Sequence, residues 1–147
     1  MTGFELGTDG PGTILTAVDG SITSLRAGAY AAGLARRQHA HLLVLTVATT
    51  SPLAAMAPGA LPVLTEAAGE LAADVQGEAR RYLEDLELTG ELIARQGDPY
   101  TEIVRLADER RVDAVVVGAS MKAGHRLVGS LAGRLVRAGK WPVTVVP

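Results

Sequence analysis

The chain of 147 residues contains no cysteine. This absence excludes disulfide bonds, zinc sites made of thiolates and catalysis by a thiol nucleophile. Aromatic residues are also scarce, at 3% of the chain, although 48% of the residues are hydrophobic. A chain of this length can form one domain with a substantial core. That core must be built from Ala, Val and Leu.

An excess of basic charge and long apolar runs are missing as well. The formal net charge of -2 argues against a nucleic-acid-binding module with a broad basic face. No stretch of about 18 uncharged apolar residues occurs, so we expect no transmembrane helix. The N-terminus lacks a basic run that leads into an apolar stretch, so we expect no signal peptide. We therefore expect a cytoplasmic protein with neither a nucleic-acid nor a membrane partner.

The periodicity of the hydrophobic residues predicts alternating strands and helices. Short apolar runs predict strands over residues 13–18, 41–47, 91–95, 113–117 and 142–146. Helical spacing predicts helices over residues 21–38, 65–86 and 130–138, with a further helix from Pro99 onward. Thr65 is the expected cap of the second helix. We expect residues 1–12 to be a flexible leader, residues 13–147 to form the domain and residues 48–64 to be a long irregular connection.

Continuous apolar strands that alternate with amphipathic helices are typical of a parallel sheet covered on both faces. We therefore predict a doubly wound α/β fold with a five-stranded parallel sheet. Right-handed crossovers place the ligand crevice of such a fold at the carboxyl ends of the strands. Three segments should meet there: residues 19–21, the chain after Val47, and residues 118–130.

The loop over residues 118–130 carries the strongest functional signal. It lies between a predicted strand and a predicted helix, and it contains Gly118, Gly124 and Gly129 before Ser130 opens the helix. Backbone amides of such a loop and the positive end of the helix dipole both attract anions. The pattern predicts a phosphate or nucleotide ligand without naming one.

The order and spacing of four short motifs resemble the universal stress protein family. These motifs are Ala-Val-Asp-Gly-Ser at 17–21, Gly-Asp-Pro at 97–99, Val-Val-Val-Gly at 115–118 and Gly-Ser at 129–130. The ending Trp-Pro-Val-Thr-Val-Val at 141–146 is similar to the terminal strand of that family. The resemblance covers about residues 13–146. It implies that the five strands of the α/β sheet lie in the order 3-2-1-4-5. It also implies a homodimer that acts in the stress response and, in some members, binds ATP.

In the ATP-binding members that this chain resembles, an Asp after the first strand and a backbone group at the end of the second strand hold the nucleoside. The phosphates lie on the glycine-containing loop. The resemblance implies a site for ATP or another adenine nucleotide, with Mg²⁺ as a companion of the phosphates. The implied site residues are Ala17, Val18, Asp19, Val47, Gly118, Ser120, Gly124, Gly129, Ser130 and Leu131.

The loop departs from the family pattern in two respects. Met121 stands where the second glycine of the pattern belongs, and ten residues separate Gly118 from Gly129, two fewer than in the pattern. Gly124 could supply the lost backbone freedom, or the Met121 side chain could obstruct the phosphates. Two functions therefore stay open: a nucleotide-binding switch or sensor, and a dimeric stress or interaction protein without a nucleotide.

Two of the site residues, Asp19 and Ser130, also have a structural interpretation. Asp19 could bind backbone amides in a turn or cap the first helix, and Ser130 could be an N-cap. Lys122, His125 and Arg126 could neutralise phosphate charge or could be solvated.

Metal and hydrolase chemistry are poorly supported by the sequence. His39 and His41 lack a partner at metal-ligand spacing, so we expect no metal site. A small hydrolase using Ser120 and His125 is a third class of function, but the chain has no Gly-x-Ser-x-Gly elbow. We expect no enzymatic activity beyond weak ATP hydrolysis.

The last predicted strand has a consequence for assembly. An apolar strand at the edge of a sheet is a template for pairing with another chain. We expect Val143, Thr144, Val145 and Val146 to lie at such an edge. A twofold homodimer through this strand would cover it, whereas the 48–64 connection or the leader could cover it within one chain.

Overall fold

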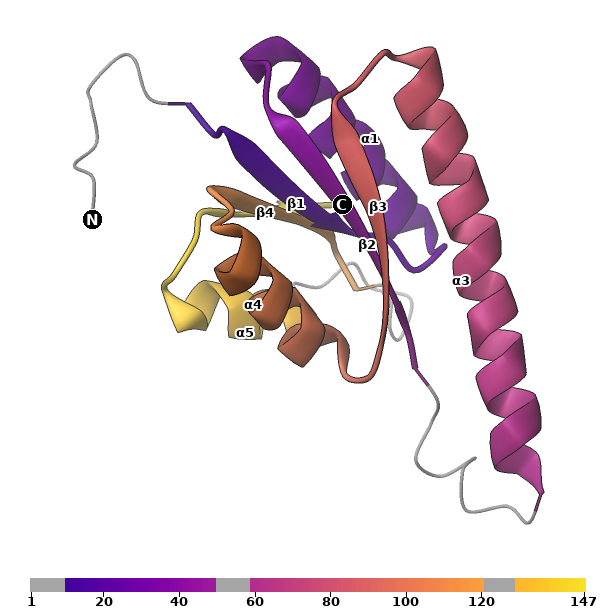
Figure 1. Ribbon diagram of the computed structural model, residues 1–147. Helices are drawn as coiled ribbons and strands as arrows, with labels where there is room; N and C mark the ends of the chain where they lie inside the picture. The colour runs from indigo at the N-terminus through magenta and orange to yellow at the C-terminus, as the bar shows by residue number, and fades with distance from the viewer. Residues whose placement is uncertain (1–9, 50–58, 121–128) are drawn as a thin grey trace.

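The computed structural model describes residues 10–49, 59–120 and 129–147. Five strands form one parallel sheet in the order β3-β2-β1-β4-β5, with helices on both faces (Figure 1). This confirms the predicted doubly wound α/β fold and its strand order. Residues 1–9 of the expected leader and residues 50–58 of the expected connection lie outside the described residues, as do Met121, Lys122, Gly124, His125 and Arg126.

The strands lie within one residue, at each end, of the ranges predicted from the sequence. They are β1 (Thr13–Ala17), β2 (His41–Ala48), β3 (Gly90–Gln96), β4 (Ala114–Gly118) and β5 (Val143–Val146). The central residues of β1, β2 and β4 are buried from both sides, because helices cover both faces of the sheet. This double burial explains why these strands are continuous apolar runs in the sequence.

The four described helices are α1 (Ile22–Gln38), α3 (Ala60–Asp85), α4 (Pro99–Arg110) and α5 (Ser130–Ala138). Ser21 caps α1 by accepting a hydrogen bond from the Ser24 amide. Asp98 caps α4 in the same way, and Pro99 occupies its first helical position, where a missing N–H costs nothing. These local signals explain why α1 and α4 begin where the sequence predicted.

The start of α3 was predicted wrongly. The helix begins at Ala60, five residues before the expected Thr65, so Thr65 lies inside the helix and is not its cap. Pro62 is tolerated because it lies in the first turn, where no amide is needed for an intrahelical hydrogen bond. The prolines in this part of the sequence therefore mark the beginning of a helix as well as a connection.

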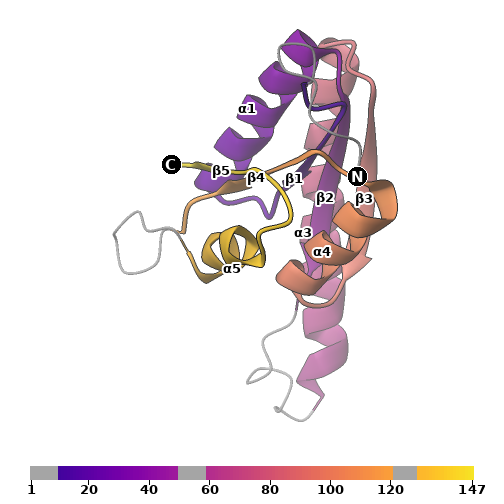
Figure 2. The ribbon, with the colours of Figure 1, turned by 90° about the vertical axis from the view of Figure 1, so that its left-hand side faces the viewer.

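Helices α1 and α3 lie on one face of the sheet and helices α4 and α5 on the other (Figure 2), and each face carries its own core. On one face α1 and α3 cover side chains such as Ile14, Leu42 and Val44. On the other face α4 and α5 cover Leu15 and Leu43. We call these the α1/α3 face and the α4/α5 face. Alternation along β1 and β2 assigns neighbouring residues to opposite faces.

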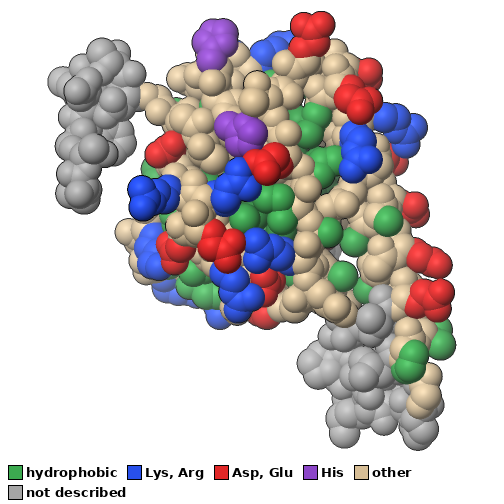
Figure 3. All heavy atoms as spheres, viewed as in Figure 1, with side chains coloured by type: hydrophobic (Ala, Val, Ile, Leu, Met, Phe, Trp, Pro, Cys, Tyr) green, Lys and Arg blue, Asp and Glu red, His purple; other side chains and the backbone are tan. Residues whose placement is uncertain are grey.

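Acidic and basic side chains are interspersed on the side of the molecule that α4 faces, as Figure 3 shows. Acidic residues of α3, among them Glu66, Glu70 and Glu84, are exposed to solvent. Within residues 10–49, 59–120 and 129–147, no helix is long and apolar enough to cross a membrane.

Candidate functional site

A crevice of about 520 Å³ opens at the carboxyl ends of β1, β2 and β4. The N-termini of α1 and α5 border it, and Pro99 at the start of α4 contributes to its wall. Nine of the ten residues predicted for the site line this crevice, and the tenth, Gly124, lies outside the described residues. The nine are Ala17, Val18, Asp19, Val47, Gly118, Ser120, Gly129, Ser130 and Leu131.

Asp19 lies in the turn between β1 and α1. Its Oδ1 accepts a hydrogen bond from the Ser21 amide at 2.9 Å, and its own amide donates to Ser24 Oγ at 3.2 Å. Partial burial raises the pKa of the Asp19 carboxyl, but the hydrogen bonds from Ser21 and Ser24 outweigh it, so the pKa lies below its ordinary value. The turn role considered from the sequence is thus confirmed. The carboxylate is charged at neutral pH and keeps further acceptor capacity toward the crevice.

Three hydroxyl side chains of the crevice are absent from the predicted list of site residues: Ser21, Thr23 and Ser24. Ser21 lies in the segment 19–21 that was expected at the crevice, whereas Thr23 and Ser24 were missed. Thr23 and Ser24 are 3% and 5% exposed, so their hydroxyls are held among packed groups and not in solvent. Ser24 Oγ donates to the Ser21 carbonyl at 2.9 Å. The N-cap signal at Ser21 could have indicated this group, because the first turn of α1 must begin at the same edge of the sheet.

Gly118 ends β4 and faces the first turn of α1. A Cβ atom at this position would lie 2.5 Å from the Thr23 carbonyl carbon and 2.6 Å from the Ser24 amide nitrogen. Real Cβ atoms do not approach backbone so closely, so only glycine allows the start of α1 to pack against the end of β4. The glycine therefore shapes one wall of the crevice by its lack of a side chain.

The start of α5 presents backbone amides to the crevice. Gly129 is the N-cap with extended backbone, and Ser130 is the first helical residue, so the N-cap interpretation of Ser130 is wrong. Gly129 has no side chain that could accept from the first-turn amides, in contrast to Ser21 in α1 and Asp98 in α4. A Cβ on Gly129 would lie 2.6 Å from the Ser120 Cβ. Two glycines thus bring backbone close to the same hollow.

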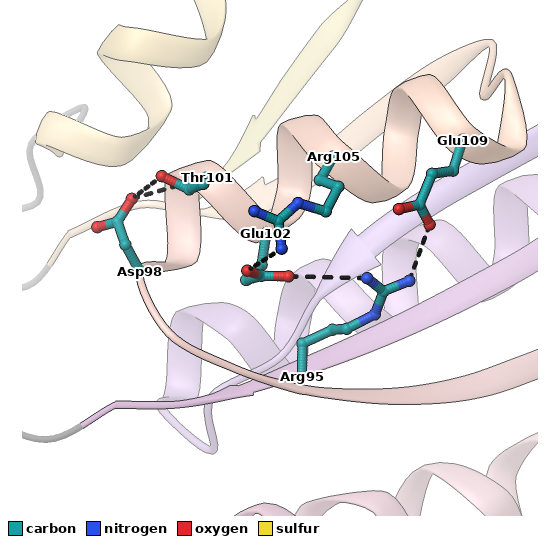
Figure 4. A network of polar contacts seen from close by, with 6 residues as sticks. All are labelled: Arg95, Asp98, Thr101, Glu102, Arg105 and Glu109. Carbon is teal, nitrogen blue, oxygen red and sulfur yellow. Dashed lines mark hydrogen bonds and ion pairs between the residues drawn. The ribbon is translucent and has the colours of Figure 1, made fainter.

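A polar network fixes the start of α4, whose Pro99 contributes to the crevice wall (Figure 4). Asp98 Oδ2 accepts from the Thr101 amide at 2.9 Å and from its hydroxyl at 2.8 Å. These bonds, from the amide first and then from the hydroxyl, lower the pKa of Asp98. Glu102, which is 6% exposed, accepts from Arg105 at 3.0 Å. The buried carboxylate is thereby partnered and anchors the helix.

Arg95 extends this network from β3 to the helix. Its guanidinium lies 3.8 Å from Glu102 and 2.9 Å from Glu109. The strand that precedes the Gly97-Asp98-Pro99 turn is therefore tied to both the middle and the end of α4 (Figure 4). The consequence is a rigid wall for the crevice on this side.

In the described part of the chain, no group of three His, Cys, Asp or Glu side chains is placed so that it could hold a metal ion. His39 ends α1 in the left-handed conformation, with φ of 52°. His41 Nε2 lies 2.8 Å from Glu91 Oε2, so this histidine has a structural partner away from the crevice. The loop residues considered as phosphate neighbours, Lys122, His125 and Arg126, lie outside the described residues.

Comparison with known proteins agrees with the motifs and the fold. The model of the universal stress protein family matches residues 11–147. A universal stress protein of Bacillus subtilis is 30% identical, with 90% of this chain and 97% of that protein covered. One of Methanocaldococcus jannaschii is 28% identical, with 90% and 80% covered.

Solved structures show the same architecture. Universal stress protein UspA from Lactobacillus plantarum superposes with a TM-score of 0.78 at 27% identity, covering 92% of this chain and 97% of the other. A universal stress protein in complex with cAMP superposes with a TM-score of 0.70 at 27% identity, covering 93% and 97%.

Proposed function

Because this chain belongs to the universal stress protein family, we propose that its carboxyl-edge crevice binds an adenine nucleotide. We take ATP, accompanied by Mg²⁺, as the nucleotide and a switch or sensor in the stress response as the role. The observation that carries the proposal is the convergence of Asp19 and the uncapped α5 start on one crevice of about 520 Å³. This volume lies within the range of small-molecule sites, about 300–1,000 Å³.

The residues present fit the two ends of a nucleotide. The Asp19 carboxylate can accept from ribose hydroxyls, and the backbone of Ala17 and Val47 offers further polar groups beside it. The amides of Ser130 and Leu131 at the positive end of the α5 dipole are suited to phosphate oxygens. A universal stress protein of similar fold at 27% identity is in complex with cAMP, which supports an adenine nucleotide here.

The phosphate end of the site can be tested by removing one amide. Ser130→Pro deletes the N–H at the first helical position, where proline is well tolerated, and Gly129 already has the extended backbone that precedes a proline. Ser130→Ala is the matched control, since it removes the hydroxyl and keeps the amide. By calorimetric titration with ATP we expect Ser130→Pro to weaken binding about tenfold or more, the value of a hydrogen bond to a charged group. Equal affinity of the two variants would contradict the phosphate site.

The nucleoside end is tested at Asp19. Asp19→Asn retains an acceptor for the Ser21 amide and removes the charge, whereas Asp19→Ala removes both. We expect both variants to lose ATP affinity and only Asp19→Ala also to weaken the turn between β1 and α1. Unchanged affinity in both would remove Asp19 from the site.

We also propose that the protein forms a homodimer through β5. Among the described strands, β5 lies at the edge of the sheet, and Val143, Thr144, Val145 and Val146 are all only partly buried. The Pro142 carbonyl accepts from the Val115 amide in β4, and the Val146 carbonyl accepts from the Ala119 amide just after it. Alternation therefore points the Val143 and Val145 amides away from β4. An edge of this kind can pair with the same edge of a second copy.

Light scattering tests this pairing. Val145→Pro removes an outward amide without touching the bonds to β4, and Val145→Ala keeps the amide as its control. We expect the wild-type protein and Val145→Ala to be dimers and Val145→Pro to be a monomer with unchanged circular dichroism. A monomeric wild-type protein would contradict the dimer.

Binding without turnover is the expected chemistry, apart from weak ATP hydrolysis. Incubation of the protein with ATP and measurement of released phosphate separates a binder from a hydrolase. The alternative, a dimeric interaction protein that binds no nucleotide, is supported if the purified protein shows no ATP binding by titration and still forms the dimer. Both outcomes leave the family assignment unchanged.

A further inference from the structure

A second cavity lies between α1 and α3, over β2. Its volume is about 140 Å³. It exists because α1 and α3 contribute small residues where they face each other, such as Gly28, Ala32 and Ala79. A chain with only 3% aromatic residues has few side chains large enough to fill the space between two helices. Small side chains at this contact between the two helices therefore leave space unfilled.

The inner wall of the cavity is apolar. Leu42 and Val44 of β2 form its floor, and Val75 and Leu83 of α3 form one side. An apolar cavity of about 150 Å³ in another protein stays free of water and accepts a benzene molecule, because water has no polar partners there. The cavity between α1 and α3 has the size and the lining for a group of that kind.

The mouth of the cavity differs from its interior. Glu78 and Tyr82 of α3 both line the cavity, and Tyr82 is 64% exposed. Among the described residues Glu78 has no ion pair, and Arg81, one turn further, donates to the Gly77 carbonyl. A carboxylate and an aromatic ring both attract cations. The charge at the mouth therefore selects a positively charged group and disfavours an anion.

We propose that the α1/α3 cavity binds a small organic cation whose apolar group, about the size of a phenyl ring, enters the cavity while its ammonium group meets Glu78. The site is distinct from the nucleotide crevice, although Val18 contributes to the walls of both. Binding of this cation requires no nucleotide. The experiments that test it therefore use the full chain without nucleotide.

Three probes that share a phenyl ring and differ in charge test the site: benzylammonium, benzyl alcohol and benzoate. We expect benzylammonium to shift the methyl NMR signals of Val44, Val75 and Leu83 in a saturable manner. Benzyl alcohol should bind about two- to fivefold more weakly, the value of one exposed ion pair, and benzoate more weakly still. The signals of Leu106 and Leu135 in the other core should not move.

Matched variants locate the ring and the charge. Gly28→Leu fills the cavity from α1 and should abolish the shifts, whereas Gly33→Leu, on the same helix and outside the cavity, should not. Ala79→Leu fills it from α3 and serves as a second variant should Gly28→Leu not fold. Glu78→Gln should bring benzylammonium to the affinity of benzyl alcohol, and Glu70→Gln should leave the preference intact.

Several results would overturn the proposal. Shifts that are equal in wild-type protein and in both filled variants would place the probes elsewhere. Equal binding of the three probes would remove the role of Glu78. If the methyl signals of Val44, Val75 and Leu83 shifted with protein concentration in the absence of a probe, a second copy of the chain would cover the cavity. None of these outcomes affects the nucleotide test at Ser130.

Discussion

The two faces of the sheet are packed by different means. On the α4/α5 face the buried core consists mainly of large aliphatic side chains, among them Leu15, Ile103, Leu106 and Leu135. On the α1/α3 face five of the eleven buried residues are alanines, and an apolar cavity of about 140 Å³ remains. The comparison teaches that one sheet can carry a core of large aliphatic side chains on one face and a core rich in alanine on the other.

Electrostatic interactions follow the same division. Every ion pair that the structure gives among its described residues involves α4 or the strand residues His41 and Glu91. Glu91 and His41 alternate with side chains of the α1/α3 core and therefore point toward the α4/α5 face. The exposed acidic residues of α3 have no such partners within the described part of the chain. The α4/α5 face is therefore the better candidate for the stable part of the domain.

The largest expected effect tests this difference in packing directly. Leu106→Ala empties a fully buried position on the α4/α5 face and should lower the free energy of unfolding by about 2–5 kcal/mol. Val75→Ala on the α1/α3 face should cost about 1.5 kcal/mol or less, since two methyl groups are removed beside an existing cavity. Urea denaturation measures both. Equal losses would show that the α1/α3 face is as well packed as the other.

A smaller effect is expected where the first turn of α1 meets β4. Gly118→Ala places a Cβ against the Thr23 backbone and should destabilise the protein by about 1–3 kcal/mol. Gly77→Ala on α3 is the control, because nothing lies within 4 Å of its added Cβ. Gly77→Ala should stabilise the protein by about 0.5–1 kcal/mol, because alanine loses less backbone entropy than glycine in a helix. Thermal unfolding of the two variants should move in opposite directions, and a stable Gly118→Ala protein would argue against the close approach.

The smallest effect concerns pH. Hydrogen bonds from Arg110 and then His41 lower the pKa of Glu91 from 4.5 to about 2. Because the folded pKa is lowered, the stabilisation is complete above pH 4.5 and is lost as the pH falls from 4.5 toward 2. Between pH 4.5 and pH 2, the free energy of unfolding should fall less steeply with decreasing pH for Glu91→Gln than for the wild-type protein. Glu84→Gln on α3 should follow the wild-type curve, and a flattened curve for Glu84→Gln instead would reverse the assignment.

The sequence predicted the start of a helix well where the residue that marks the start also makes the hydrogen bond that caps the helix. Ser21 and Asp98-Pro99 have the hydrogen-bonding chemistry of helix starts, and α1 and α4 begin there. The start of α3 was missed because a proline in a first turn and a proline in a connection give the same local pattern. In the crevice, Asp19 and Ser130 could be predicted because a parallel sheet brings strand ends together.

The sequence by itself determined the α/β architecture, the strand order through its family motifs, and nine described residues that line one crevice. Only the tertiary structure decided the contribution of Thr23 and Ser24, the need for glycine at position 118 and the cavity beneath α3. The physical reason is distance along the chain. Periodicity and capping depend on residues a few positions apart, whereas close approach and unfilled volume depend on how separate elements meet in space.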